Sequence, residues 1–374
     1  MGKYSTPTWA DVTPIPLDDG SNFYDNDNPQ QQEGGGGVSG NGNGTYPLAT
    51  ISYSPNYVEA TSYLRALMAA NEMSDRAIEL TEDVILINPA HYTVWLYRAK
   101  ILFALEKDLN KEIEWVNKIA LMNLKNYQIW HHRQLILSNE KFFPTLPPTE
   151  QKFLMEMFDL DSKNYHVWTY RHWLVRHFKL WDHPQELADV ETLINKDVRN
   201  NSAWNHRWML KFGPRGDVDS GMPLGIDERR GYKGSLDVVD EDLIMAEIEY
   251  AKNKILLAPE NRCPWAYARG VLRAAGKSMA ELEGFASKFI LEEVEAEADG
   301  GVKYQVKSSL AVEWLADVYA EEAEEAEDEK DTEEKRKADA VKMLTLLKDQ
   351  YDPIRKNYWD YRIRMLERGP VVAV

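Results

Sequence analysis

The sequence predicts an all-α protein, an α-α superhelix built as a right-handed, crescent-shaped solenoid of helical hairpins. Three observations lead to this fold class. First, one motif recurs in which a tryptophan is followed three or four residues later by an arginine; the tryptophans are Trp95, Trp130, Trp168, Trp204, Trp265 and Trp359. Second, successive copies lie 35, 38, 36, 61 and 94 residues apart, and a period near 35 is typical of one helix-turn-helix unit. Third, no segment has the alternating pattern of a strand, so we expect none.

The individual helices follow from apolar residues at helical spacing, starting near Tyr57. Asn88-Pro89 ends the first clear helix, because proline disfavours helical backbone in the residue before it. Short connections join the segments, so neighbouring helices should pack antiparallel. The expected helices are 74–87, 92–105, 111–124, 127–137, 149–160, 165–178, 185–194 and 202–211.

The chain divides by composition into a short lead and one long domain. Residues 1–50 contain a run of Gly, Asn and Ser that cannot bury enough apolar surface, so we expect them to be mostly flexible. Residues 51–374 should form a single helical-repeat domain with insertions near 213–239 and 321–337. The first insertion is rich in Gly and Asp and predicts a long loop. The second is strongly acidic and is either a solvated extension of a helix or a disordered loop.

Charge and composition exclude several classes of function. The formal net charge of −17 over 374 residues repels a phosphate backbone, so we expect no nucleic-acid binding. The single cysteine, Cys263, excludes a disulfide framework and a cysteine cluster for zinc, which favours a reducing, cytoplasmic setting. No run of eighteen apolar residues exists, so we expect no transmembrane segment. The start Met1-Gly2-Lys3-Tyr4-Ser5-Thr6 satisfies the loose N-myristoylation pattern but no basic patch follows, and modification of Gly2 stays open.

The repeated residues have structural roles first. Asn126, Asn164 and Asn200 each stand four residues before a tryptophan, where a side chain can cap the start of a helix. The six tryptophans are expected to pack between consecutive units, because large aromatic side chains dominate such interfaces. The arginines, Arg171 among them, should pair with carboxylates or with carbonyl groups at helix ends.

The third and fourth copies differ from the others in chemistry. Lys163 precedes Asn164, and His166 follows Tyr165; Arg199 precedes Asn200 in the next unit. Two helix N-termini beside Lys163 would offer partial positive charge and unpaired N–H groups to an anion. No zinc-ligand spacing, nucleotide-binding glycine loop or serine elbow is found in the sequence, so any demanding chemistry must come from another chain.

These motifs resemble the α-subunit repeats of protein prenyltransferases. The segments Lys163-Asn164-Tyr165-His166-Val167-Trp168 and Asn200-Asn201-Ser202-Ala203-Trp204-Asn205-His206-Arg207 carry the resemblance. The segment Trp9-Ala10-Asp11-Val12-Thr13-Pro14-Ile15-Pro16-Leu17-Asp18-Asp19-Gly20 resembles the lead-in of the α subunit shared by farnesyltransferase and type I geranylgeranyltransferase. The likeness covers nearly the whole chain. The two insertions, and Trp359 arriving two residues early in its repeat, depart from it.

The resemblance implies a division of labour between two subunits. A β subunit, an α/α barrel, would hold the catalytic zinc and most of the isoprenoid pocket, and magnesium would accompany the diphosphate; this chain would bind no cofactor itself. The heterodimer would transfer a farnesyl or geranylgeranyl group from its diphosphate to the cysteine of CaaX-terminated proteins such as small GTPases. The β subunit would decide which isoprenoid is used.

The same resemblance assigns roles to particular residues. Lys163 and Tyr165 match the catalytic positions near the diphosphate, with Lys163 stabilising the leaving group. His166 lies at a position close to the peptide's terminal carboxylate, and Tyr127 at one near the peptide exit. Other positions match substrate-binding or site-shaping residues of the family: Asn164, Asn200, Trp204, Arg207 and Arg171.

Two alternatives remain at this point. The chain could be the related α subunit of the Rab-directed type II geranylgeranyltransferase, which often carries extra domains. It could also be a non-catalytic scaffold of TPR type, although Lys163 beside an intact Asn-Tyr pair argues against that.

Overall fold

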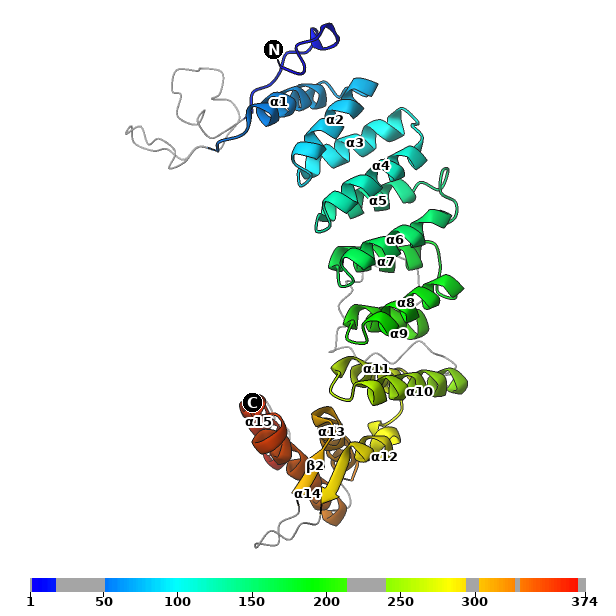
Figure 1. The fold of residues 1–374 in the computed structure, drawn as a ribbon, viewed down its shortest axis with the longest axis vertical. Helices are drawn as coiled ribbons and strands as arrows, with labels where there is room; N and C mark the ends of the chain where they lie inside the picture. The colour runs from blue at the N-terminus through cyan, green and yellow to red at the C-terminus, as the bar shows by residue number, and fades with distance from the viewer. Residues whose placement is uncertain (1, 18–50, 214–239, 294–302, 327–329, 369–374) are drawn as a thin grey trace, which may run out of the picture. The chain divides into compact units, whose positions relative to one another are not determined.

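The computed structural model describes residues 2–17, 51–213, 240–293, 303–326 and 330–368. Its contacts divide the chain into two compact units, Met1–Arg171 and His172–Val374, and each is described by itself. The all-α fold of helical hairpins is confirmed (Figure 1). The extent of the single domain over 51–374 stays a prediction. The insertion expected at 213–239 and most of the flexible segment expected over 1–50 lie outside the described residues.

The first unit contains six complete helices and the start of a seventh. Within it α1 packs on α2, α2 on α3, α3 on α5 and α4 on α5. The helices are α1 (Pro55–Ala69), α2 (Asp75–Ile87), α3 (Tyr92–Ala104), α4 (Leu109–Met122), α5 (Tyr127–Leu137), α6 (Pro148–Leu160) and α7 (Tyr165–His177), whose last turns belong to the second unit. The helix at 127–137 matches the expected range, and the other expected helices differ from the observed bounds by at most two residues at either end.

The second unit begins with two hairpins and ends in a three-helix layer. In it α8 packs on α9, α9 on α11, α10 on α11, α13 on α14 and α14 on α15. The helices are α8 (Pro184–Lys196), α9 (Asn201–Phe212), α10 (Glu241–Leu257), α11 (Arg262–Ala274), α12 (Glu283–Ala286), α13 (Ser309–Glu325), α14 (Lys330–Leu346) and α15 (Lys356–Arg368). Short 3-10 or π turns lie at Met279–Leu282, Ser287–Phe289, Leu347–Tyr351 and Pro353–Arg355, and a further one, Pro7–Trp9, lies in the first unit.

A small sheet in the second unit corrects the expectation of no strand. Strands β1 (Ile290–Glu293) and β2 (Lys303–Val306) pair antiparallel, with Ile290 opposite Val306. Each strand has four residues, which is too short for a periodic pattern to stand out in the sequence. The pair lies within the long step between Trp265 and Trp359.

The acidic stretch at 321–337 is helical where it is described. It forms the end of α13 and the start of α14, while residues 327–329 lie outside the described residues. Arg336 joins the two helices, because its guanidinium lies 2.9 Å from the Glu322 carboxylate and over the ring of Tyr319. Of the two alternatives for this stretch, the helical extension therefore describes these residues.

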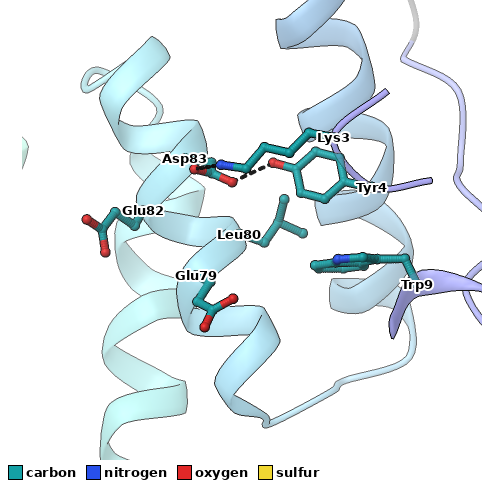
Figure 2. Close-up of a pocket in the computed structure, with 7 residues that line it drawn as sticks. All are labelled: Lys3, Tyr4, Trp9, Glu79, Leu80, Glu82 and Asp83. Carbon is teal, nitrogen blue, oxygen red and sulfur yellow. Dashed lines mark hydrogen bonds and ion pairs between the residues drawn. The ribbon is translucent and has the colours of Figure 1, made fainter. Parts of the chain in front are cut away.

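The N-terminal residues 2–17 dock on α1 and α2. The composition of residues 1–50 did not predict this docking. Tyr4 and Trp9 are buried, and Trp9 packs edge-on against Tyr63 of α1 at 5.5 Å between ring centroids. Arg76 of α2 binds both carboxylate oxygens of Asp11, at 2.7 and 2.9 Å. Figure 2 shows the adjoining cavity, where the side chains of Lys3 and Tyr4 both reach Asp83. The lead-in motif around Trp9 thus packs on α1 and α2, the first two helices of the unit.

All six repeat tryptophans are buried, as expected for core packing. Trp130 of α5 packs against Tyr170 of α7 and Phe153 of α6, with ring centroids 5.1 and 6.4 Å apart. Trp168 lies 4.3 Å from Phe158 by the same measure. Trp130 therefore joins α5 to α6 and α7, and Trp168 joins α7 to α6.

The capping asparagines have a second role that joins one repeat to the next. The Asn126 side-chain oxygen accepts from the Gln128 amide at 2.8 Å, which confirms the cap, while its Nδ2 donates to the Pro89 carbonyl at 2.7 Å. The Pro89 carbonyl also accepts from the Trp95 indole at 2.8 Å. The same cap-to-carbonyl bond recurs from Asn164 to Leu124, from Asn261 to Val198 and, with a hydroxyl, from Ser308 to Pro259.

Three of the repeat arginines pair with buried glutamates that the sequence interpretation did not single out. Arg98 binds both carboxylate oxygens of Glu112 at 2.7 Å, and His132 lies 2.8 Å from the same group. This pattern recurs where Arg133 and Tyr170 share Glu150, and where Arg207 and Tyr267 share Glu247. In each case the arginine comes from one repeat, while the glutamate and its second partner come from the next.

Replacing Trp130 by alanine should lower the free energy of unfolding by about 3 to 5 kcal/mol, because a large buried aromatic leaves a cavity. Thermal and denaturant unfolding of the purified chain would measure the loss. A variant that melts like the parent would contradict the packing role.

Glu112 should make stability depend on acid. Burial by itself raises the pKa of this carboxyl, but hydrogen bonds from His132 and Arg98 outweigh burial and hold the pKa at about 2, below its ordinary 4.5. A lowered folded-state pKa contributes stability above pH 4.5 that is lost as the pH falls toward 2. Glu112→Gln should therefore cost about 3 kcal/mol at neutral pH.

The test is the difference in unfolding free energy between parent and Glu112→Gln, followed from pH 7 down to the acid limit of folding. The difference should shrink below pH 4.5. Glu114→Gln, at an exposed position of the same helix, is the matched control and should stay close to the parent. A constant difference across this range would show that the charge of Glu112 is not what matters.

Candidate functional site

The candidate site in the first unit is the turn 161–164 together with the start of α7. Asp161 ends α6, and its backbone carbonyl accepts from the Asn164 amide at 3.1 Å while its side chain accepts from the Lys163 amide at 3.3 Å. Asn164 is buried, whereas Lys163 and Tyr165 on either side of it are exposed. The turn therefore fixes its middle residue in the protein and presents the two flanking side chains on the surface.

Asn164 confirms the predicted cap and corrects one part of the anion-site expectation. Its side-chain oxygen accepts from the amides of His166 and Val167, at 3.0 and 3.3 Å. Asn200 binds the amides of Ser202 and Ala203 in the same way, at 3.1 and 3.3 Å. These amides were expected to be available to an anion, but the caps occupy them. An anion here would be met by side chains and by the helix dipole.

Aromatic side chains surround the start of α7. The rings of Tyr127 and His166 lie 6.4 Å apart at 31°, and those of Tyr165 and His166 lie 5.7 Å apart nearly at right angles. Tyr127 and Tyr165 are the first residues of α5 and α7 and are 60% and 73% exposed. The structure thus brings Tyr127, Tyr165 and His166 together at one edge of the first unit.

Tyr92 holds the same position at the start of α3 and was missed in the sequence. It is 64% exposed, and like Tyr127 and Tyr165 it stands three residues before a repeat tryptophan. That shared spacing was the available signal. The exposed tyrosines therefore begin one repeat before the predicted site.

Two predicted site residues lie in the second unit and are buried. Asn200 caps α9, and Arg207 is held by Glu247 at 2.7 Å and Glu191 at 3.0 Å. Burial by itself lowers the pKa of Arg207, but the hydrogen bonds that its guanidinium donates to Glu247 and the charge of that carboxylate raise the pKa, so the guanidinium stays charged. These contacts give both residues a structural role, and their part in substrate binding stays a prediction.

Arg171 is fully buried at the end of the first unit. Its guanidinium lies over the ring of Phe158, 5.9 Å from the centroid, and near the Met155 sulfur at 3.6 Å. Both contacts lie inside the protein. Arg171 therefore shapes the region behind α7 and does not face solvent.

Among the described residues, no group of three or more His, Cys, Asp or Glu side chains is arranged to hold a metal ion. Across the same residues, no helix is both long and apolar enough to cross a membrane. The cavity beside Tyr4 and Trp9 contains none of the predicted site residues.

Comparisons with known proteins agree on one family. A profile described as "Protein prenyltransferase alpha subunit repeat" matches residues 74–105, 109–140, 147–178 and 183–210. The chain is 37% identical to the protein farnesyltransferase/geranylgeranyltransferase type-1 subunit alpha of Candida albicans, over 85% of this chain and 92% of the relative. It is 30% identical to the Dictyostelium discoideum protein of that name, over 95% of this chain and 91% of the relative.

A solved structure agrees along the whole chain. Candida albicans protein geranylgeranyltransferase-I complexed with GGPP includes a chain that matches with a TM-score of 0.71 and 33% identity, covering 98% of this chain and 100% of that chain. The human geranylgeranyl transferase type-2 subunit alpha matches less well, at 27% identity over 59% of this chain and 37% of the relative. The chain belongs to the family of the α subunits of protein farnesyltransferase and geranylgeranyltransferase type 1.

Proposed function

We propose that this chain is the α subunit of a heterodimeric CaaX protein prenyltransferase and that it completes an active site whose zinc is held by the β subunit. The observation that carries the proposal is the turn 161–164, which buries Asn164 and leaves Lys163 and Tyr165, the residues before and after it, exposed. A cation and a phenol at a helix start suit a diphosphate, which carries concentrated negative charge. The solved relative complexed with GGPP supports an isoprenyl diphosphate as the ligand.

In this proposal the chain contributes electrostatic stabilisation of the leaving group. As the bond between the allylic carbon and the diphosphate oxygen breaks, negative charge grows on the diphosphate. Lys163 offsets that charge, the Tyr165 hydroxyl donates a hydrogen bond, and the positive end of the α7 dipole adds to both. Zinc in the β subunit would supply the acceptor cysteine as a thiolate.

The remaining predicted residues divide by exposure. Tyr127 is exposed, and the half-buried His166 lies between it and Tyr165; both are proposed to contact the CaaX peptide. Asn164, Asn200 and Arg207 are buried in caps and ion pairs, and we assign them to holding the site in shape. Magnesium bound with the diphosphate, small GTPases as substrates and a cytoplasmic location belong to this proposal.

The proposal predicts that the chain alone is inactive. Co-expression with a type 1 prenyltransferase β subunit should give a stable complex that transfers an isoprenyl group to a CaaX peptide and loses activity when zinc is chelated. Activity of the chain by itself, or failure to form a complex with farnesyltransferase and geranylgeranyltransferase β subunits alike, would refute it.

Lys163→Ala should lower turnover of that complex by about 10²- to 10³-fold, the usual effect of removing one group that stabilises a transition-state charge. Stability should change little, because the side chain is exposed. Single-turnover kinetics with a CaaX peptide would separate the chemical step from binding. Lys152→Ala, at another exposed lysine, serves as the control, and turnover equal to the parent would remove Lys163 from the site.

A further inference from the structure

Two links, not one, join the turn that carries Lys163 to the preceding loop. The first is the cap bond common to the repeats, from Asn164 Nδ2 to the Leu124 carbonyl at 2.7 Å. The second is an ion pair between the next residue, Lys125, and Asp161, with 2.8 Å between Nζ and Oδ2. Asp161 is the residue whose other oxygen binds the Lys163 amide.

Asp161 places a negative charge next to the proposed diphosphate contact. The hydrogen bond from Lys125 is the main cause that holds the pKa of Asp161 below its ordinary value, so this carboxyl is charged at neutral pH. It lies two residues from Lys163 and bonds to its backbone. A diphosphate approaching Lys163 therefore also meets a carboxylate, and Lys125 is the cation that offsets it.

The junction one repeat earlier shows that two repeats can be joined, and the turn can form, without this charge pair. There Asn126 alone joins the loops through the Pro89 carbonyl, at 2.7 Å. Ala90 occupies the position of Lys125, and Asn123 that of Asp161, so both positions are uncharged. The turn itself forms with a neutral amide, because Asn88 Oδ1 accepts from the Ala90 amide at 3.2 Å. The charges were therefore not needed to build the repeat.

We propose that Lys125 is a positioning residue of the diphosphate site, acting through Asp161 by neutralising its carboxylate. The inference rests on the proposed function, since it requires that Lys163 meets the diphosphate. Lys125 itself is 79% exposed at its side chain, so its loss removes little packing. Removing it would leave an unbalanced negative charge that repels the substrate and the growing charge of the leaving group alike.

The test uses the complex with a geranylgeranyltransferase type I β subunit, geranylgeranyl diphosphate and a fluorescent CaaX peptide. Lys125→Met should raise the KM for the diphosphate about tenfold, the scale of one charge interaction at several ångströms near a protein surface. The KM for the peptide should stay within about twofold. Added salt should reduce the effect, because the pair is exposed.

A double variant separates charge from structure. Asp161→Asn keeps a side chain that can form the turn, as Asn88 does, and removes the charge. Combined with Lys125→Met it should restore the diphosphate KM to within about twofold of the parent. If the pair were only a mechanical clamp, the double variant would be as impaired as Lys125→Met, and that result would overturn the proposal.

Two further variants make the outcome specific. Lys141→Met breaks another exposed pair in the first unit, with Glu106 at 3.1 Å, and should leave the diphosphate KM unchanged. An unchanged KM in Lys125→Met, together with impaired Lys163→Ala, would overturn this inference alone. Normal turnover in Lys163→Ala would instead refute the site on which both proposals rest.

Discussion

The carboxylate that three of the repeats bury against the preceding repeat is the constraint on which the packing of these hairpins depends. A charged glutamate is costly to remove from water unless it is paired and hydrogen-bonded. Glu112, Glu150 and Glu247 meet that condition only because an arginine arrives from the preceding repeat and a histidine or tyrosine from their own. The pairing therefore fixes the register at which one of these repeats follows the next, with more precision than apolar packing alone provides.

The cap asparagines complete that register at the loop edge of the stack. The side-chain oxygen of each asparagine caps its own helix, and the side-chain nitrogen binds a carbonyl of the previous loop. Each cap therefore also sets the spacing between two repeats. At the turn 161–164 this coupling has a functional result. Asn164 binds both the previous loop and the start of its own helix. The backbone of the exposed residues on either side of it is therefore held in place, as a preorganised site requires. The scaffold and the proposed site thus share the same atoms.

Much of this could be predicted from the sequence, because the informative residues recur. The helix ranges, the caps at Asn126, Asn164 and Asn200, and the burial of the tryptophans followed from period and position. The glutamates did not, since a single carboxylate within a helix is ordinarily solvated, and only its partners from two repeats show that it is buried. The docking of Trp9 and Asp11 was missed for a related reason. Composition judges a segment by itself, whereas Arg76, which receives it, lies 65 residues beyond Asp11.

The shared glutamates also bear on how such a chain can change during evolution. Arg98 and Glu112 are 14 residues apart in the sequence, whereas Arg207 and Glu247 are 40 apart because an insertion separates them. Both ion pairs form. New sequence is thus tolerated between the partners. A whole hairpin that carries both the arginine and the glutamate could likewise be removed or copied, because its neighbours would again match an arginine to each buried acid. This chain can therefore diversify through its loops, while the arginine and the buried acid at each of these junctions must be kept together.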